Sequence, residues 1–330
     1  MPNNLSSSKE LKSSIEKIMK ETHYENFDEW VTNFAINLEN IWDEKSAKNL
    51  QPLNSENLQD GKNSAIVIGR GPSIKKYDHL KLLADSNYQG NIMCCDGALS
   101  DALKAGVTPD KFQKFFVTTI EPYSNIRKHY DEEIIDTYGS KIKGIFTVIS
   151  NPNVVERARQ AGIKIHWIHS LFDYNEGEKS FNSLSALMIR AKNPNHGLPA
   201  IQTGGNVGTS SWFISWQVLK CTTVALIGIN HGWEEDDTWE TIISHGDMGN
   251  EKNIDRNSPS FKKLFKKIHN PDFDCNCIMD PLFQFYSEAL KEFIFRSPEW
   301  VNTVNATEGG SIFGKRIKSM KFADFLRNIR

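Results

Sequence analysis

The sequence has no apolar run long enough to cross a lipid bilayer. Its first residues, MPNNLSSSKELKSS, lack the apolar core of a secretory signal peptide. The five cysteines are an odd number without a disulfide framework, which indicates free thiols. Two of them, Cys275 and Cys277, fall in an expected loop, and their spacing is not that of a zinc motif. These absences predict a cytoplasmic protein.

A long basic run is also missing, and the formal net charge is −2. Affinity for nucleic acids rests mainly on Lys and Arg contacts to phosphate, so no nucleic-acid partner is expected. One local cluster of cations is interpreted as the solvated face of a short basic helix, and it comprises Lys262, Lys263, Lys266 and Lys267.

From residue 64 onward the chain alternates between short apolar strands and helical patterns. Strands are expected at 66–68, 91–95, 112–120, 144–149, 163–168, 222–227 and 300–304. Helices are expected at 74–86, 98–105, 125–138, 153–161, 181–191, 206–219, 280–295 and 318–327. Repeated βα units of this length predict an α/β fold, with a Rossmann-like, doubly wound and mostly parallel sheet and right-handed crossovers.

Two segments differ from this alternation. Residues 1–60 are predicted as a helical N-terminal extension, with helices at about 9–21 and 27–47, and residues 61–330 as the main domain. The stripe of Trp30, Phe34 and Trp42 predicts a face that packs on the main domain or on a partner subunit, so the N-terminal helices could form a homo-oligomer. Residues 233–276 are polar and predict a lid-like insertion that contains His245.

The first strand runs into a glycine loop whose residues are predicted to bind a nucleotide: Gly69, Gly71, Pro72 and Ser73. Glycines allow the backbone to approach a ligand, and Ser73 can cap the next helix, whose N-terminus would attract phosphate. The loop is neither a dinucleotide fingerprint nor a Walker loop, because the third glycine and the Gly-Lys-Ser/Thr sequence are missing. A tight structural turn is the alternative.

A second glycine-rich stretch opens the helix expected at 206–219, and its candidate nucleotide-binding residues are Gly204, Gly205, Asn206, Gly208 and Thr209. Exposed N–H groups and hydroxyls at a helix start form a cradle for phosphate or diphosphate. Close helix packing on small residues is the alternative explanation. Paired with the first loop, this stretch predicts a two-sided nucleotide cradle.

Further polar residues follow other strands at the same expected edge. Asp96 could accept hydrogen bonds from a ribose or a base, or could cap a helix. Glu121 could hold a metal ion or a substrate hydroxyl, or simply precede the end of the strand. His231, next to Asn230 on the rim, is placed for proton transfer or for contact with a leaving phosphate. Glu308 could close the site from the C-terminal side, or lie in a surface turn.

Six stretches together resemble the MptE-like domain family: AIVIGRGPSI, CCDGAL, GVTPDKFQKFFVTTIEP, TGGNVGTSSW, VALIGINH and NATEGG. That family includes the archaeal 6-hydroxymethylpterin diphosphokinases and the Maf motility-associated flagellin glycosyltransferases. The glycine loop is also similar to that of the family-42 sialyltransferases, which use CMP-sialic acid. The resemblance covers about residues 64–314.

The resemblance implies a transferase with a nucleotide-activated donor at 69–73 and 204–209. The leading expectation is transfer of a nonulosonic, sialic-acid-like sugar from a CMP-sugar to the hydroxyl of a small molecule, a glycan or a protein. Asn206 and Thr209 would stabilise the leaving phosphate, and His231 or Glu121 would deprotonate the acceptor.

Two alternatives stay open. One is ATP-dependent diphosphate transfer to 6-hydroxymethyl-7,8-dihydropterin, which would use Mg²⁺. The diphosphokinase branch has an Asp-rich segment after the third strand, where this chain has one carboxylate, Glu121. The other alternative is a nucleotide-binding partner protein without catalytic activity.

Overall fold

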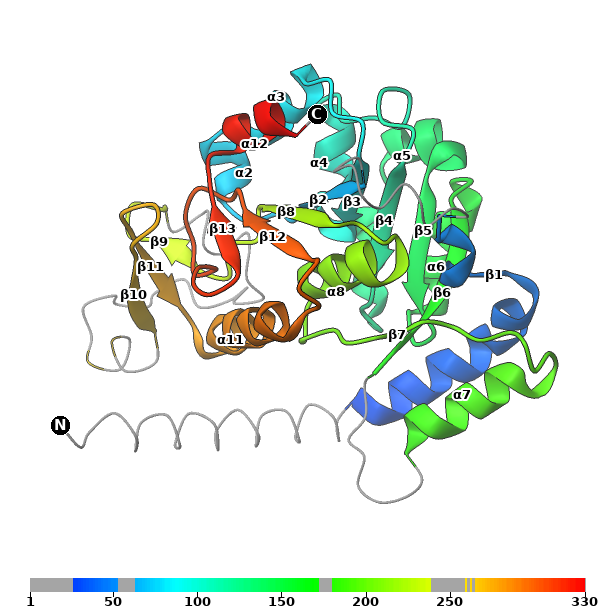
Figure 1. The fold of residues 1–330 in the computed structure, drawn as a ribbon. Coiled ribbons are helices and arrows are strands. Elements are labelled where there is room, and N and C mark those ends of the chain that lie inside the picture. Colours follow the sequence, from blue (N-terminus) through cyan, green and yellow to red (C-terminus); the bar gives the residue numbers. More distant parts are fainter. Residues whose placement is uncertain are drawn as a thin grey trace.

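A parallel sheet with helices on both faces forms the centre of the protein (Figure 1). The computed structural model describes residues 26–52, 63–171, 180–238, 259, 262 and 265–329. In spatial order the strands of this sheet are β1 (Lys45–Ser46), β6 (Lys164–Ser170), β5 (Lys143–Thr147), β4 (Phe115–Thr119), β3 (Asn91–Cys95), β2 (Ser64–Ile68), β8 (Thr223–Ile227), β12 (Asn302–Asn305) and β13 (Ile317–Ser319). Neighbouring strands run parallel, and β7 (Ala200–Ile201) pairs with the end of β6.

The strand order changes direction between β2 and β8. From β2 the chain adds β3, β4, β5 and β6 on one side, and then returns to add β8, β12 and β13 on the other side. This order is that of a doubly wound sheet with a topological switch point, so the predicted fold class is confirmed.

Strands buried on both faces explain the apolar runs in the sequence. Every residue of β2 is buried, and its side chains alternate between two hydrophobic clusters. Ile66 and Ile68 belong to the cluster on one face, whereas Ala65 and Val67 belong to the cluster on the other. Because side chains alternate along a strand, an unbroken apolar run fits a sheet covered on both sides.

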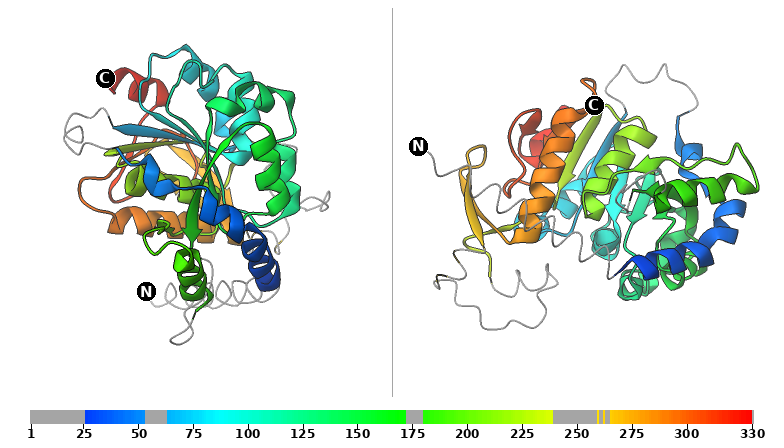
Figure 2. Two further views of the ribbon diagram at one scale, coloured as in Figure 1. Left: turned by 90° about the vertical axis from the view of Figure 1, so that its right-hand side faces the viewer. Right: turned by 90° about the horizontal axis from the view of Figure 1, so that it is seen from below.

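The helices form a layer on each face of the sheet (Figure 2). On one face lie α8 (Val207–Phe213), continued by a π-helical turn, η6 (Ile214–Val218), and α11 (Pro281–Arg296). On the other face lie α3 (His79–Asp85), α4 (Leu99–Lys104), α5 (Glu133–Tyr138), α6 (Pro152–Gln160) and α12 (Phe322–Asn328). The remaining α-helices are α2 (Ser73–Lys76) and α7 (Phe181–Ala191).

The predicted strands are confirmed as β2, β3, β4, β5, β6, β8 and β12. The predicted helix at 74–86 is two helices, because Asp78 has a left-handed backbone (φ 51°) that separates α2 from α3. The predicted helix at 318–327 is wrong in its first turn, because residues 317–319 form β13 and pair with β12. Strands of two or three residues are too short to show a periodic pattern.

The N-terminal segment is helical at 26–43 within the described residues and packs on the main sheet. Phe34 and Ile41 are buried in the core, and the Phe34 ring meets Phe181 of α7 edge-on, with ring centroids 5.6 Å apart. Trp42 donates a hydrogen bond from Nε1 to the carbonyl of Met188, at 3.1 Å. The predicted aromatic stripe therefore packs within the chain, and the helix predicted at 9–21 lies outside the described residues.

The insertion after β8 contains an antiparallel sheet in the described residues. It consists of β9 (Trp233–Glu234), β10 (Lys266–Asn270) and β11 (Cys275–Met279), in the order β10-β11-β9. Cys275 and Cys277 lie in β11, so the predicted loop is wrong. Lys266 and Lys267 lie in β10, so the predicted basic helix is wrong at these positions. A polar hairpin lacks the apolar alternation by which strands are recognised.

His245 lies outside the described residues. The five cysteines are free thiols. None of the helices in the described ranges is long and apolar enough to cross a membrane.

Two buried asparagines should anchor the helix at 26–43 to the sheet. Asn33 donates from Nδ2 to the carbonyls of Pro122 (2.9 Å) and Ile149 (3.2 Å). Asn37 donates to Ser150 O at 2.8 Å. Asn33→Ala and Asn37→Ala should each lower the free energy of unfolding by about 1–3 kcal/mol, because buried carbonyls lose their donors.

Urea denaturation measures this change. Glu39→Ala, on the exposed side of the same helix, serves as the control and should stay within about 0.5 kcal/mol of the wild type. Equal stability of all three variants would contradict the anchoring role.

Candidate functional site

The carboxyl ends of β2 and β8 define the candidate site. In open α/β sheets, ligands bind outside the carboxyl ends of the strands at the switch point, which here lies between these two paired strands. The loop Gly69–Ser73 follows β2, and the loop Gly228–Gly232 follows β8. Two of the predicted motifs therefore lie side by side at the expected edge.

The two loops pack backbone on backbone. The amide of Gly69 donates to Ile227 O (2.9 Å) and that of Gly71 to Gly228 O (2.8 Å). A Cβ on Gly69 would lie 2.3 Å from Gly228 O, which leaves no room for a side chain. The glycines therefore serve the contact between the loops, and the amides of Gly69 and Gly71 are already bonded within the protein.

Ser73 and Asn230 join the same two loops through their side chains. Both are buried, and Ser73 Oγ donates to Asn230 Oδ1 at 2.9 Å. The predicted capping role of Ser73 is wrong, because Pro72 occupies the N-cap of α2 and no side chain caps that helix. The carbonyl of Asn230 also accepts the amide of Ser311 at 2.9 Å. These hydrogen bonds hold the loops after β2 and β8 against each other.

The second glycine motif forms the turn before α8. Gly204 (φ 55°) and Gly205 (φ 80°) both have left-handed backbones, which glycine adopts without strain. Asn206 is the N-cap, with Oδ1 accepting the Thr209 amide at 2.8 Å and Nδ2 donating to Thr209 Oγ1 at 3.0 Å. The amides of Val207 and Gly208 have no partner among the described residues. These two N–H groups lie at the start of α8, where a helix lacks intrahelical acceptors and an anion could accept from them.

The two glycine motifs meet at one side chain, Ile229. A Cβ on Gly69 would lie 2.5 Å from Ile229 Cδ1, and a Cβ on Gly208 would lie 2.7 Å from the same atom. Ile229 is buried, so the motifs flank it closely. Stretches more than 130 residues apart in the chain therefore lie on either side of one side chain.

Asp96 lies at the end of β3 in a buried polar network. Its Oδ1 accepts the Gly97 amide (2.7 Å) and its Oδ2 accepts Thr119 Oγ1 (3.0 Å). The hydroxyls of Thr119 and Tyr130 are 2.7 Å apart. Burial raises the pKa of Asp96 to about 6, against the lowering effect of these hydrogen bonds and of the positive charge of Arg70. The carboxyl group is therefore partly protonated near neutral pH.

Arg70 is the cation of this edge, and the site residues predicted from the sequence did not include it. Its side chain is exposed and lies against Gly97, where a Cβ would be 2.7 Å from Arg70 Cδ. The pKa of His129 falls to about 4, first because of burial and second because of the charge of Arg70. Arg70, in the loop after β2, thus lies close to Gly97 in the loop after β3 and to His129 in the loop after β4. An arginine between two glycines in such a loop is the signal that could have found it.

His231 follows β8 in a buried aromatic environment. Its ring stacks on Phe283 (centroids 6.4 Å apart, planes at 17°) and lies 6.0 Å from Tyr286, both on α11. Burial, with a smaller effect of the Lys291 charge, lowers the pKa of His231 to about 3. Its Nδ1 is buried without a hydrogen-bond partner. The imidazole is therefore neutral at physiological pH.

Tyr286 connects His231 to the second glycine motif. A Cβ on Gly205 would lie 2.5 Å from Tyr286 Cε1. One aromatic ring thus borders both the turn before α8 and the imidazole. The sequence shows Tyr286 only as an apolar position of a helix, so pattern analysis could not assign it to the site.

The two remaining predicted carboxylates are placed differently. Glu121 lies just beyond β4, half-buried, and β3 separates β4 from β2. Glu308 is turned toward α12, where its Oε1 accepts the amide of Phe322 at 3.0 Å and lies 3.3 Å from His79 Nε2. The carboxylate of Glu308 therefore connects its own turn to the start of α12.

The described residues contain no group of three or more His, Cys, Asp or Glu side chains that could hold a metal ion. At the edge, both oxygens of Asp96 are already hydrogen-bonded. The described side chains thus do not form a pre-arranged Mg²⁺ site.

The fold and the position of the site place the protein among the Rossmann-like α/β proteins, and comparisons with known proteins narrow this class. The chain belongs to the MptE-like family, because the family model described as "6-hydroxymethylpterin diphosphokinase MptE-like" matches residues 32–236. No curated protein matches the chain.

A solved structure, the Maf glycosyltransferase from Magnetospirillum magneticum AMB-1, has a similar fold. It has a TM-score of 0.53 and 15% sequence identity over 82% of this chain. The match covers 34% of that protein, so the chain spans about a third of its length. Both the family description and the name of this structure are those of transferases.

Replacing a glycine at the contact between the loops should destabilise the protein. A Cβ at Gly71 would lie 2.2 Å from Asn230 Oδ1 and 2.7 Å from Gly228 O. Gly71→Ala should lower the free energy of unfolding by about 1–3 kcal/mol. In Gly197→Ala, the control, the new Cβ would meet only the ends of two flexible side chains, Lys48 and Arg190, and the change should stay within about 0.5 kcal/mol in the same denaturation assay. A similar stability of both variants would contradict the close packing.

Asp96 should make stability depend on pH. Its folded pKa of about 6 lies above the ordinary value of 3.8, so the native state favours the protonated form. The destabilisation of the folded state by ionisation of the buried Asp96 is small at low pH and grows as pH rises through the folded pKa. Relative to the wild type, Asp96→Asn should therefore gain about 1 kcal/mol of stability between pH 5 and pH 7. Denaturation at both pH values measures this gain, and a constant difference would contradict it.

Proposed function

We propose that the protein is a transferase that binds a nucleotide-activated donor at the carboxyl edge between β2 and β8. The observation that carries this proposal is the meeting of the two glycine motifs on either side of Ile229. The switch point of a doubly wound sheet is where such folds bind ligands. Membership of a family described by a diphosphokinase, and a fold shared with a glycosyltransferase, support a transfer reaction.

The donor phosphate would lie between Arg70 and the start of α8. Arg70 offers a planar cation that suits phosphate oxygens. The amides of Val207 and Gly208 have no partner among the described residues and suit an anion at a helix start. Positive charge and N–H groups that are already in place stabilise the negative charge that develops on a leaving phosphate.

A CMP-linked nonulosonic sugar is the donor that we favour. Departure of a nucleoside monophosphate develops charge on a single phosphate, which one guanidinium and two amides can stabilise. The Maf glycosyltransferase with which this chain shares its fold is named as an enzyme of sugar transfer, and this supports a sugar donor. The acceptor would be a hydroxyl of a small molecule, a glycan or a protein.

The acceptor hydroxyl must lose its proton, and the two candidate bases differ. With a pKa of about 3, the buried imidazole of His231 is a weak base. We therefore assign His231 an orienting role through hydrogen bonds, and Glu121 the role of base. Glu121 is half-buried at the same edge and one strand away from Asp96.

Diphosphate transfer to 6-hydroxymethyl-7,8-dihydropterin is the second candidate, favoured by the description of the family model over residues 32–236. It predicts release of AMP when ATP, Mg²⁺ and the pterin are present together. Sugar transfer predicts release of CMP from a CMP-sugar. A protein that binds a nucleotide and releases neither product would be the non-catalytic partner protein.

Calorimetric titration with CMP, CDP, UMP and ATP, with and without Mg²⁺, tests the donor site. Arg70→Ala should weaken binding of the preferred nucleotide about tenfold or more, because a charge-assisted contact to phosphate is lost. Lys75→Ala, an exposed cation on α2, should change it less than about twofold. No binding by the folded wild type, or equal effects of the two variants, would contradict the proposed site.

A further inference from the structure

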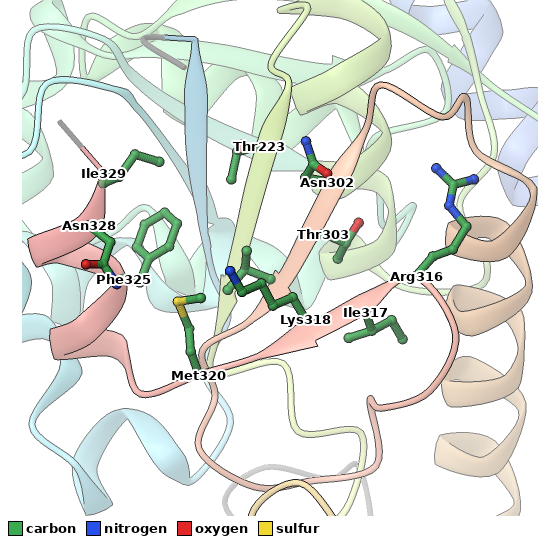
Figure 3. Close-up of a pocket in the computed structure, with 11 residues that line it drawn as sticks. Thr223, Asn302, Thr303, Arg316, Ile317, Lys318, Met320, Phe325, Asn328 and Ile329 are labelled. Atoms are coloured by element: carbon green, nitrogen blue, oxygen red, sulfur yellow. The ribbon is translucent and has the colours of Figure 1, made fainter. Parts of the chain in front are cut away.

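A cavity of about 540 Å³ lies between the edge of the sheet and α12 (Figure 3). Thr223 and Asn302, the first residues of β8 and β12, contribute to its lining together with Val304. Phe325 of α12 and Ile329, which directly follows that helix, form an apolar wall. Thr223 and Asn302 are at the amino ends of their strands, so the cavity is separate from the carboxyl-edge site.

Lys318 is the cation that a ligand in this cavity could use. It is exposed, and it extends from β13 toward the α12 side of the cavity (Figure 3). It has no ion-pair or hydrogen-bond partner among the described residues. Arg316 differs, because its guanidinium is held by backbone carbonyls, including Pro298 O at 2.7 Å and Phe295 O at 3.2 Å. Arg316 is therefore held in place by these carbonyls, whereas Lys318 has no counter-ion among the described residues.

The surrounding chain has a strong positive balance. The sequence of residues 315–330 contains one acidic residue, Asp324, and six basic residues: Lys315, Arg316, Lys318, Lys321, Arg327 and Arg330. Asp324 already pairs with Arg327. In a protein of net charge −2, the sequence of this segment is therefore rich in positive charge, and it borders a cavity lined by both apolar and polar side chains.

We propose that this cavity binds an amphipathic organic anion, a free small molecule with an acidic group at Lys318 and an apolar body against the wall of α12. Ligand sites of this kind are mostly apolar, with a few polar groups that orient the ligand. Asn302 and Asn328 add two amides to the lining, and Met320 adds a side chain that adapts to the shape of a ligand. The site does not depend on the proposed transfer reaction.

Three probes with one apolar body and different charges test the proposal: 4-phenylbutanoate, 4-phenylbutan-1-ol and 4-phenylbutylamine. The full-length protein carries ¹³C-methyl methionine, and the signal of Met320 is identified by its loss in Met320→Leu. We expect the anion to shift this signal with a Kd of about 1 mM, as suits a ligand of this size. The alcohol should bind about threefold to tenfold more weakly, and the amine more weakly still.

Lys318→Gln should remove the preference for the anion and leave binding of the alcohol unchanged. Lys315→Gln is the matched control, because this lysine lines a neighbouring groove and lies over Phe295. It has the same change of charge and should keep the preference.

Three results would overturn the proposal. The first is equal binding of the three probes, or no binding of any probe by the folded protein at concentrations up to about 10 mM. The second is an equal loss of preference in Lys318→Gln and Lys315→Gln. The third is loss of the Met320 signal on vesicles of anionic phospholipid without any response to the free anion, which would assign the surface to a membrane.

Discussion

The contact between the loops that follow β2 and β8 is the constraint on which the site depends. Gly69 and Gly228 approach so closely that neither position has room for a side chain. The hydrogen bond between Ser73 and Asn230 then fixes the two loops to each other. Because this contact uses the amides of Gly69 and Gly71, the proposed donor would lie beside the loops, toward α8, rather than between them. Rigid loops of this kind position a ligand without reorganising when it binds.

Burial sets the charge of the side chains around this centre. It raises the pKa of Asp96 to about 6 and lowers that of His231 to about 3, so Asp96 is partly protonated near neutral pH and the imidazole is neutral. Arg70, which is exposed, keeps a full positive charge. The positive charge of Arg70, beside the neutral imidazole of His231 and the partly protonated Asp96, supports the proposal of an anion at this edge. The edge therefore combines fixed geometry with local positive charge.

Much of this arrangement could be predicted from the sequence, because it rests on patterns of neighbouring residues. The apolar run at residues 65–68 and the glycines after it identify a buried strand and its carboxyl end. The sterical role of Gly69 and the partner of Ser73 could not be predicted, because each depends on atoms more than 150 residues away in the chain. Glu308 was misleading for a different reason, since its partner is the amide of Phe322 at the start of a helix that packs back on the sheet, and the sequence gives no sign of that contact.

A crystal structure of the protein with CMP tests the central claim most directly. The account predicts the phosphate beside Arg70 and the amides of Val207 and Gly208, with the loops after β2 and β8 unchanged. A nucleotide bound elsewhere, for example at the cavity beside α12, or a site that requires the contact between Gly71 and Gly228 to open, would contradict it.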